Sequence, residues 1–422
     1  MFGDFRAFYC AGELVRQHAF SYAESAIAPC ESVSLPGFYT ASSATVVPAP
    51  LPGYLAALFV PFSLLPFPLA CAAWTAFSVA CVFAAFAVLA RLGWARFDTA
   101  VVASAILLGT AVLVQGELSS VALLGIALVI YGCERDRAAL RVAGLVLAFA
   151  EPQIALGVAA VLAARRRTLF EVFAVVVGLF ALSLVTIGWS ANVAYLQDFL
   201  PAHVAAELAR AQQYTLSWAF AQLGASPAVA LWCGRVFFAA ALAAAYWCGR
   251  RGRPEIAVAG GAALALAFGP FVHLDHLICA LPAAFVAARE IRIAGALALL
   301  LVALPVTAIF AQPLLLLAVP VVVFWVLVSF GISSRAATYG ALAGVMTGAA
   351  FAVVSVRLGF NFSAGRASGG AWATYIARHE VVTGLLIWIV KAPVWIGLAS
   401  IAVVAAALAV RSEFGSAARH IR

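Results

Sequence analysis

Two histidines and an aspartate lie close together in the segment from Pro270 to Leu277. His273 and His276 are spaced i, i+3, so they share one face if this turn is helical. Together with Asp275, these imidazoles can relay a proton, bind a metal ion or pair with a lipid phosphate. A metal site would need further ligands, and the rest of the sequence offers no evident partner. A polar turn between two apolar segments is the alternative interpretation.

An aspartate near the first residue could be a second reactive group. Asp4 lies in a segment rich in aromatic residues, which also holds Arg6 and Tyr9. A carboxylate at the mouth of a membrane cavity can take the proton from a sugar hydroxyl as that hydroxyl attacks. Aromatic residues are also common at membrane interfaces, so an acid without a chemical role is the alternative.

Two further groups of polar residues could bind a sugar or a phosphate. The polar stretch 190–228 holds His203 and Gln213, which suit hydrogen bonding to a sugar and equally suit a solvated loop. Lys391 is the only lysine and lies inside an apolar run. Lys391 and Arg378 could neutralise an anionic lipid phosphate. Extension of these side chains to the membrane surface is the alternative.

The composition places these residues in a membrane protein. The chain of 422 residues is 66% hydrophobic and only 10% charged, whereas soluble proteins carry about 25% charged residues. Apolar runs of bilayer-spanning length recur, so we expect an all-α, polytopic transmembrane protein with about 11–12 membrane segments, some short or re-entrant. The net charge of +8 lies in short arginine clusters between apolar runs. Such clusters set membrane topology, which excludes nucleic-acid binding as the main function.

The apolar runs alternate with three long polar stretches, 1–47, 190–228 and 357–381. Residues 51–66 are apolar but bounded by prolines, and we expect an interfacial helix there. The predicted membrane segments are 68–90, 99–114, 118–133, 142–163, 170–189, 229–249, 256–269, 277–288, 293–309, 312–330, 337–356 and 383–410.

The distribution of arginine indicates the orientation and one irregular segment. If residues 142–163 form a re-entrant hairpin, most cations fall on the cytoplasmic side, whereas a single crossing would place most of them outside. The positive-inside rule therefore favours the hairpin, with all three long polar stretches on the outer side. The hairpin is interrupted at Glu151-Pro152-Gln153, and two short segments meet at Gln115-Gly116-Glu117. Because interrupted apolar segments line protein or water, we expect a cavity open to the outer face.

The eight cysteines include no Cys-x-x-Cys pair, which argues against a zinc or iron–sulfur site. Cys10 and Cys30 share the first polar stretch. They could form a disulfide if that stretch faces an oxidising compartment.

In chain order, these features resemble the glycosyltransferases of family 87, polytopic membrane proteins with the GT-C fold. The family opens with an outward Asp-Phe segment that ends in Ala-Gly, matched by residues 4–12, and continues with a proline-rich stretch, matched by 48–66. A Gly-Gln-type turn is matched loosely by Gln115-Gly116. A Lys-Pro-Gln step is matched by Glu151-Pro152-Gln153, and a Pro-aromatic-x-His turn by 270–277. The resemblance extends from residue 3 to residue 290.

Two departures from the family pattern bear on function. Glu151 stands where the family has a lysine, which reverses a charge that could bind an anion. Family members also have a transmembrane helix before the Asp-Phe segment. Direct export of the short acidic N-terminal tail is one interpretation, but we favour a preceding helix ahead of Asp4 in the complete protein.

The resemblance implies transfer of a mannose-like hexose from a polyprenyl-phosphate donor to a glycolipid or polysaccharide acceptor. The implied transfer is inverting, metal-independent and free of cofactors, in a multi-pass protein of the bacterial inner membrane with its active site on the extracytoplasmic face. A multi-pass transporter or lipid flippase is the alternative, although the two halves of the chain show no convincing repeat. Asp4 is expected to deprotonate the acceptor, assisted by His273 or His276, which could instead contact the phosphate. The candidate catalytic residues are Asp4, His273 and His276, and the candidate substrate-binding residues are Arg6, Tyr9, Gln115, Glu117, Glu151, Gln153, Gln213, Asp275, Arg378 and Lys391.

We expect three parts along the chain. Residues 1–67 would form an outward-facing segment with the interfacial helix. Residues 68–290 would form the GT-C-like transmembrane core with the outer loop 190–228, and residues 291–422 would add transmembrane helices with the outer loop 357–381.

Overall fold

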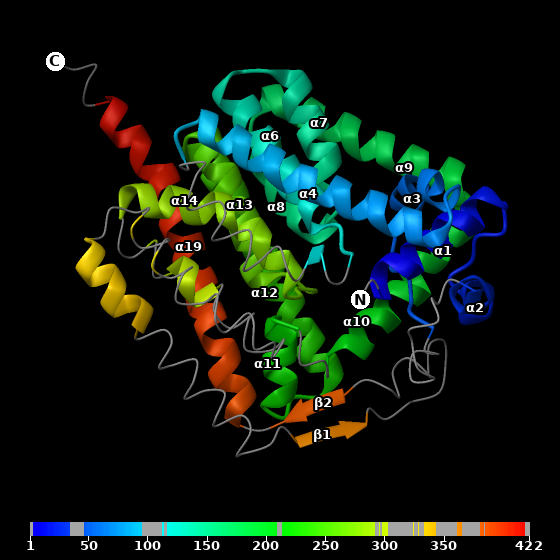
Figure 1. The fold of residues 1–422 in the computed structure, drawn as a ribbon. Coiled ribbons are helices and arrows are strands. Elements are labelled where there is room, and N and C mark those ends of the chain that lie inside the picture. Colours follow the sequence, from blue (N-terminus) through cyan, green and yellow to red (C-terminus); the bar gives the residue numbers. More distant parts are fainter. Residues whose placement is uncertain are drawn as a thin grey trace.

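The part of the chain that the computed structural model describes is almost entirely helical, which confirms the all-α prediction (Figure 1). Its strands are β1 (Asn361–Ala364) and β2 (Glu380–Thr383), a short antiparallel pair from the polar stretch 357–381. The described residues are 3–33, 46–94, 112–113, 116–208, 213–291, 295, 298–302, 324, 328, 333–342, 361–364, 380–383 and 385–417.

The helices follow one another with mostly short connections. In chain order they are α1 (Gly3–Arg16), α2 (Glu24–Val33), α3 (Gly53–Ser63), α4 (Phe67–Arg91), α6 (Ser119–Glu134), α7 (Ala138–Ala148), α8 (Pro152–Ala163), α9 (Arg166–Ala194), the π-helix η2 (Tyr195–Phe199), α10 (Leu200–Glu207), α11 (Leu216–Gln222), α12 (Pro227–Arg251), α13 (Pro254–Phe268), the 3-10 helix η3 (Asp275–Ala280), α14 (Leu281–Glu290) and α19 (Leu385–Ala417).

In the part of the chain that the structure describes, four helical stretches are long and apolar enough to cross a membrane, which supports an integral membrane protein. They are Phe67–Arg91, Arg166–Glu207, Pro227–Arg251 and Lys391–Arg411. Their outward side chains include large apolar groups such as Phe170, Trp189 and Trp232, which suit contact with lipid. The predicted segments 99–114 and 312–330 lie largely or wholly outside the described residues, as do parts of 293–309 and 337–356.

The hairpin predicted at 142–163 is present as α7 and α8. The chain turns back between them, and Pro152 begins α8 at a position where its missing N–H costs nothing. Helix α7 packs along α6, and α8 packs along α13 at Gly157 and Gly261, where a Cβ would collide with the facing backbone. Small residues let helices approach this closely in apolar surroundings.

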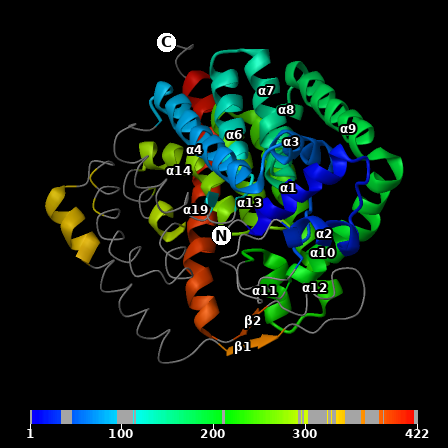
Figure 2. The same cartoon turned by 45° about the vertical axis from the view of Figure 1, so that its right-hand side comes forward.

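Both ends of the hairpin lie at one end of the molecule. Arg141 of α7 forms an ion pair with Glu171 of α9 at 2.6 Å. Arg165, just after α8, donates from Nε to the carbonyl of Gly249 in α12 at 2.9 Å. We call this region the arginine-rich end. Figures 1 and 2 show that the α6–α7 connection there lies opposite the β1–β2 pair.

The stretch 190–228, predicted as a polar loop, is largely helical. Helix α9 bends at Gly188, whose φ of 79° suits glycine. Asn192 then binds the carbonyls of Ser183 and Gly188 through its side-chain amide. The chain continues through η2, α10 and α11, and several of its polar side chains, such as Glu207 and Gln213, are buried in tertiary contacts rather than exposed on a loop.

The N-terminal segment is a helix packed on aromatic residues. Phe5 of α1 stacks on Trp74 of α4 with ring centroids 5.7 Å apart, and both side chains are buried. Gly12 allows α1 to approach the backbone of α3 closely. A disulfide joins Cys10 to Cys30, as the sequence allowed, and ties α1 to α2. These contacts fix the direction of α1 and with it the position of Asp4.

Candidate active site

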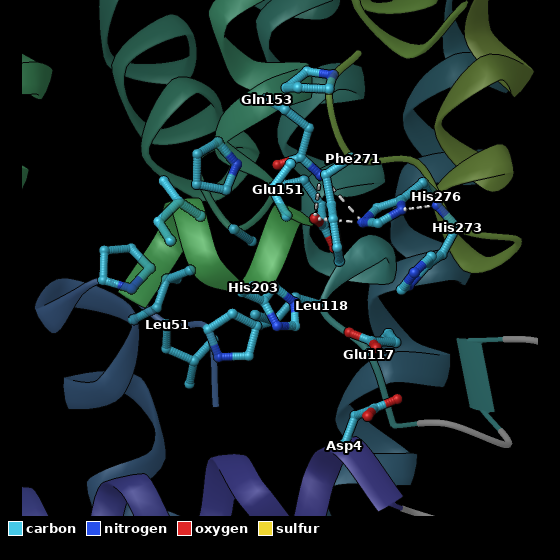
Figure 3. A pocket seen from close by; sticks show the side chains of 18 of the residues that line it. Asp4, Leu51, Glu117, Leu118, Glu151, Gln153, His203, Phe271, His273 and His276 are labelled. Carbon is cyan, nitrogen blue, oxygen red and sulfur yellow. Dashed lines mark hydrogen bonds and ion pairs between the residues drawn. The ribbon is translucent and has the colours of Figure 1, made fainter. Parts of the chain in front are cut away.

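A cavity of about 270 Å³ lies where several distant segments meet. Asp4 of α1 and Glu117 lie on one side of it, while Glu151 and Gln153 at the tip of the hairpin lie on another (Figure 3). His273 and His276 also line the cavity. Six of the candidate residues, scattered over more than 270 positions of the sequence, are therefore brought to one cavity.

The hairpin tip carries a buried carboxylate. Glu151 is the residue before α8, with φ −120° and ψ 86°, and it is 6% exposed. Its Oε2 lies 2.8 Å from His276 Nε2, and the side-chain amide of Gln153 donates to the same oxygen at 3.0 Å. Its Oε1 lies 2.9 Å from Ser119 Oγ. Side chains from two other helices, Ser119 of α6 and His276 of η3, thus provide hydrogen-bond partners for the carboxylate that interrupts the apolar run.

The two imidazoles lie next to each other in an ordered turn before and within η3. Their ring centroids are 5.8 Å apart, as the i, i+3 spacing predicted. His273 Nε2 lies 3.1 Å from a carboxylate oxygen of Glu207 and 2.7 Å from the amide of Gln213. The backbone N–H of His273 donates to His276 Nδ1 at 2.7 Å. Because Nδ1 accepts this bond, His276 Nε2 carries the ring proton and donates to Glu151.

Asp4 faces a second carboxyl group across the cavity. Burial, followed by the charges of Asp4 and Asp275, raises the pKa of Glu117 well above its ordinary value. The raised pKa favours the protonated form of Glu117, which can donate a hydrogen bond to Asp4. The preceding Gly116 has a φ of 80°, and its carbonyl accepts the indole N–H of Trp74 at 2.8 Å, which fixes this turn.

Five candidate substrate-binding residues do not line the cavity. Arg6 forms an ion pair with Glu31 at 3.0 Å, and the Tyr9 hydroxyl donates to the carbonyl of Leu65 at 3.0 Å. Gln213 is hydrogen-bonded to His273, and Asp275 Oδ2 lies 3.8 Å from His276 Nε2, so both residues lie behind the imidazoles. Lys391 is fully buried elsewhere, with Nζ 3.4 Å from the centre of the Trp218 ring, and it donates to the carbonyl of Gln213.

The expectation that these five contact substrate is therefore not supported for a ligand in this cavity. The physical reason is that each has a protein partner within the fold and lies outside the cavity lining. Gln115 and Arg378 lie outside the described residues.

Other residues at the site were not singled out from the sequence. Ser119 binds Glu151 and also Asp275, at 2.8 Å. His203 and Phe271 line the cavity, with ring centroids 5.3 Å apart. Ser119 begins an apolar segment two residues after Glu117 and carries no sequence signal of its own, whereas His203 stood among the polar residues of 190–228.

The cavity has an unusual balance of charge. Its lining in the described part of the chain includes three carboxyl groups and three imidazoles but no lysine or arginine.

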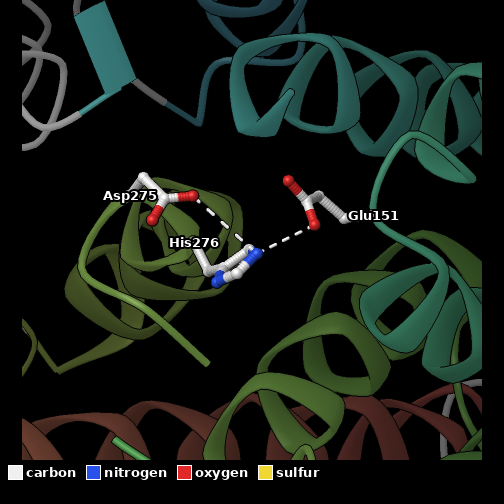
Figure 4. A group of neighbouring side chains, drawn as sticks. All are labelled: Glu151, Asp275 and His276. Atoms are coloured by element: carbon white, nitrogen blue, oxygen red, sulfur yellow. Dashed lines mark hydrogen bonds and ion pairs between the residues drawn. The ribbon is translucent and has the colours of Figure 1, made fainter. Parts of the chain in front are cut away.

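Glu151, Asp275 and His276 each place one ligand-type atom within 4.8 Å of the others, a spacing compatible with a metal ion (Figure 4). A metal would need His276 Nε2 without its proton, yet the His273 N–H directed at Nδ1 keeps that proton on Nε2. The geometry therefore fits a hydrogen-bonded cluster better than a metal centre.

Comparison with known proteins identifies the family. Residues 52–274, more than half of the chain, match the family model of glycosyltransferase family 87. The matched range includes Glu117, Glu151 and His273 and ends just before Asp275. No curated protein and no solved structure gives a significant match to the chain. With the cavity and its reactive groups in place, the match shows that the chain belongs to glycosyltransferase family 87 and is a glycosyltransferase.

Proposed function

We propose that this glycosyltransferase moves a mannose-like hexose from a polyprenyl-phosphate donor to a glycolipid or polysaccharide acceptor. The observation that carries the proposal is the position of Asp4 on the same cavity as His273 and His276. A single base beside groups that can contact a phosphate is what such a transfer requires.

In the proposed reaction Asp4 takes the proton of the acceptor hydroxyl. The hydroxyl oxygen attacks the anomeric carbon from the face opposite to the leaving phosphate, so the configuration inverts in one step. One base suffices, by analogy with the one-step displacement in inverting glycosidases. The transfer needs no metal, because a polyprenyl monophosphate leaves without a diphosphate that a metal would have to bridge.

The imidazoles are the groups best suited to the phosphate. In its described part the lining holds no guanidinium or ammonium group, and its imidazole N–H groups can stabilise the leaving phosphate. His276 carries its ring proton on Nε2, the nitrogen that lies beside the cavity residue Glu151. His273 lines the cavity next to it.

Two features support an extracytoplasmic active site at the inner membrane of a bacterium. The Cys10–Cys30 disulfide belongs to the helix that carries Asp4, and disulfides persist in oxidising compartments. The arginine-rich end lies away from the hairpin tip that lines the cavity, in accord with cytoplasmic arginines and an outer cavity.

The three proposed parts of the chain would then have different roles in the transfer. Residues 1–67 would supply the base on an outward segment whose α3 lies at the interface. Residues 68–290 would form the GT-C-like core that binds donor and acceptor, and residues 291–422 would complete the membrane bundle.

The test is transfer of a labelled sugar from glycosyl phosphopolyprenols by purified protein in detergent. We expect Asp4→Asn to lower kcat by about a hundred- to ten-thousand-fold, the usual contribution of a general base. The amide keeps the size of the side chain but cannot take up the proton.

Glu13→Gln is the matched control. Glu13 lies on the same helix, where it pairs with Arg16 away from the cavity, and the variant should transfer at the wild-type rate. Undiminished transfer by Asp4→Asn would remove Asp4 from the mechanism. Comparing mannosyl with other glycosyl donors identifies the sugar.

A further inference from the structure

The hydrogen bonds around Ser119 require one more proton than the serine can supply. Its Oγ lies 2.9 Å from Glu151 Oε1 and 2.8 Å from Asp275 Oδ2. A hydroxyl has a single proton, so it donates to one of these oxygens and must accept from the other. At such distances one of the two carboxyl groups therefore carries a proton.

The partners of the two carboxyl groups indicate which one is protonated. Glu151 accepts from His276 Nε2 and from the Gln153 amide through its other oxygen, and such donors stabilise an anion. Asp275 is 0% exposed, and its Oδ1 has no hydrogen-bond partner among the residues that the structure describes. A buried charge without donors is far more costly than a neutral acid. The proton therefore belongs to Asp275.

The state of His276 agrees with a neutral Asp275. Although burial opposes it, the charges of Asp275 and Glu151 together raise the pKa of His276 to about 9, which would favour the imidazolium. The His273 N–H that points at Nδ1 instead requires the neutral ring. Removing the charge of Asp275 removes the largest of the three effects that favour the imidazolium, the others being the charge of Glu151 and its hydrogen bond.

We propose that Asp275 and Ser119 are positioning residues that hold a transferable proton for Glu151. In the resting state Asp275 Oδ2–H donates to Ser119 Oγ, and Ser119 Oγ–H donates to Glu151 Oε1, so the negative charge lies on Glu151. If the serine proton moves to Glu151 while the aspartate proton moves to the serine, the charge shifts to Asp275. No proton enters or leaves, and the negative charge moves from the cavity wall to a side chain outside its lining.

This shift gives Glu151 a role in binding the donor, so it rests on the proposed function. An anionic lipid phosphate entering the cavity would be repelled by a charged Glu151. Its approach favours the state in which Glu151 is neutral and Asp275 carries the charge. In its neutral form Glu151, which replaces the family's lysine, no longer repels the donor phosphate in the cavity.

The first experiment does not depend on activity. The infrared absorption of protonated carboxyl groups is measured for the purified protein at neutral pH. Asp275→Asn should remove one such group, whereas Asp198→Asn, at an exposed position, should remove none. An unchanged absorption in Asp275→Asn would overturn the assignment of the proton, whether or not the protein transfers sugar.

The second experiment measures donor kinetics. Asparagine can donate to Ser119 but has no acidic proton to pass on, so Asp275→Asn fixes the charge on Glu151. We expect the KM for the phosphopolyprenol donor to rise about tenfold, equivalent to about 1.4 kcal/mol, with a smaller change in kcat. Adding Glu151→Gln removes that charge and should bring the donor KM most of the way back to the wild-type value. A double variant no better than Asp275→Asn would show that the role of Asp275 is only structural.

A serine pair provides a second comparison if the aspartate variant folds poorly. Ser119→Ala breaks the connection between the carboxyl groups and should raise the donor KM by a similar factor. Ser120→Ala is the matched control, because Ser120 is equally buried and its hydroxyl has no partner in the described part of the structure. Equal KM values for the two variants would contradict the proposal.

Discussion

The arginine-rich end and the cavity both bury charged groups, but they neutralise them in different ways. Arg141 is 7% exposed and binds Glu171 through two nitrogens, Asp136 through a third contact, and the carbonyl of Gly132. At the cavity, carboxyl groups meet imidazoles, a serine and one another. A guanidinium keeps its charge under all physiological conditions, whereas the cavity groups can exchange protons. The comparison indicates that one end stabilises the bundle and the other can perform chemistry.

After that of Asp4→Asn, the largest expected effect on function lies at His276. His276→Asn should lower kcat/KM by about a hundred- to a thousand-fold, because it removes an N–H donor placed to stabilise the leaving phosphate. The measurement is transfer from a labelled phosphopolyprenol donor. His18→Asn, at an exposed position with a φ of 55° that asparagine tolerates, is the control and should leave transfer unchanged. Full activity of His276→Asn would contradict the proposal that the cavity performs the chemistry while the arginine-rich end only stabilises the bundle.

In contrast to His276→Asn, Arg141→Met should lower the stability of the protein and leave its activity unchanged. It leaves the partly buried Glu171 without its cation, so we expect a loss of about 2–3 kcal/mol in the free energy of unfolding, less than for a fully buried pair. The activity of the protein that remains folded should be unchanged. Thermal unfolding in detergent measures the loss, with exposed Arg167→Met as the control. A selective fall in kcat without loss of stability would show that the arginine-rich end takes part in catalysis.

The disulfide should contribute a comparable amount of stability at the cavity end. Replacing Cys10 and Cys30 by serine should lower stability by about 3 kcal/mol and reduce activity, because α2 is then less firmly tied to the helix that carries Asp4. Unfolding in detergent, with and without reductant, measures the effect. Cys71→Ser, which removes a free cysteine, should behave like the wild type. Identical stability of the double variant and the wild type would contradict the predicted contribution.

The smallest expected effect is a pH dependence at Glu31. Burial, only partly opposed by Arg6, raises the pKa of Glu31 to about 7. A carboxyl group with a raised pKa in the folded state favours folding when protonated. Its contribution is complete below the ordinary pKa of the unfolded chain and is lost as the pH rises through about 7.

Unfolding midpoints measured between pH 4 and pH 8 test this assignment. The wild type should lose stability over that interval relative to Glu31→Gln, which cannot titrate. Parallel curves for the two proteins would show that Glu31 titrates normally in the fold.

The sequence predicted the hairpin because arginine content and an interrupted apolar run are properties of the local chain. It also placed Asp4, Glu151 and the two imidazoles near one cavity, through the resemblance to family 87. It did not predict Ser119, because a serine within an apolar segment carries no signal of its own. The role of Ser119 comes from contacts with residues 32 and 156 positions away.

Lys391 is a predicted site residue that the structure places away from the cavity. A lone lysine in an apolar run suggested phosphate binding, yet its charge is satisfied by the Trp218 ring and the carbonyl of Gln213. The polar stretch 190–228 was likewise expected to be a loop. Its polar residues serve tertiary contacts, such as that between Gln213 and His273, 60 positions apart. Partners this distant in sequence are set by packing, which composition and spacing do not encode.

The central claim is that Asp4 and the imidazoles face one cavity that binds the donor from one side of the membrane. Single variants Asp4→Cys and His273→Cys, in sealed vesicles of known orientation, can be labelled with a membrane-impermeant thiol reagent and compared with the parent protein. We predict that both cysteines react from the same side and that a glycosyl phosphopolyprenol protects both. Labelling from opposite sides of the membrane would contradict the claim.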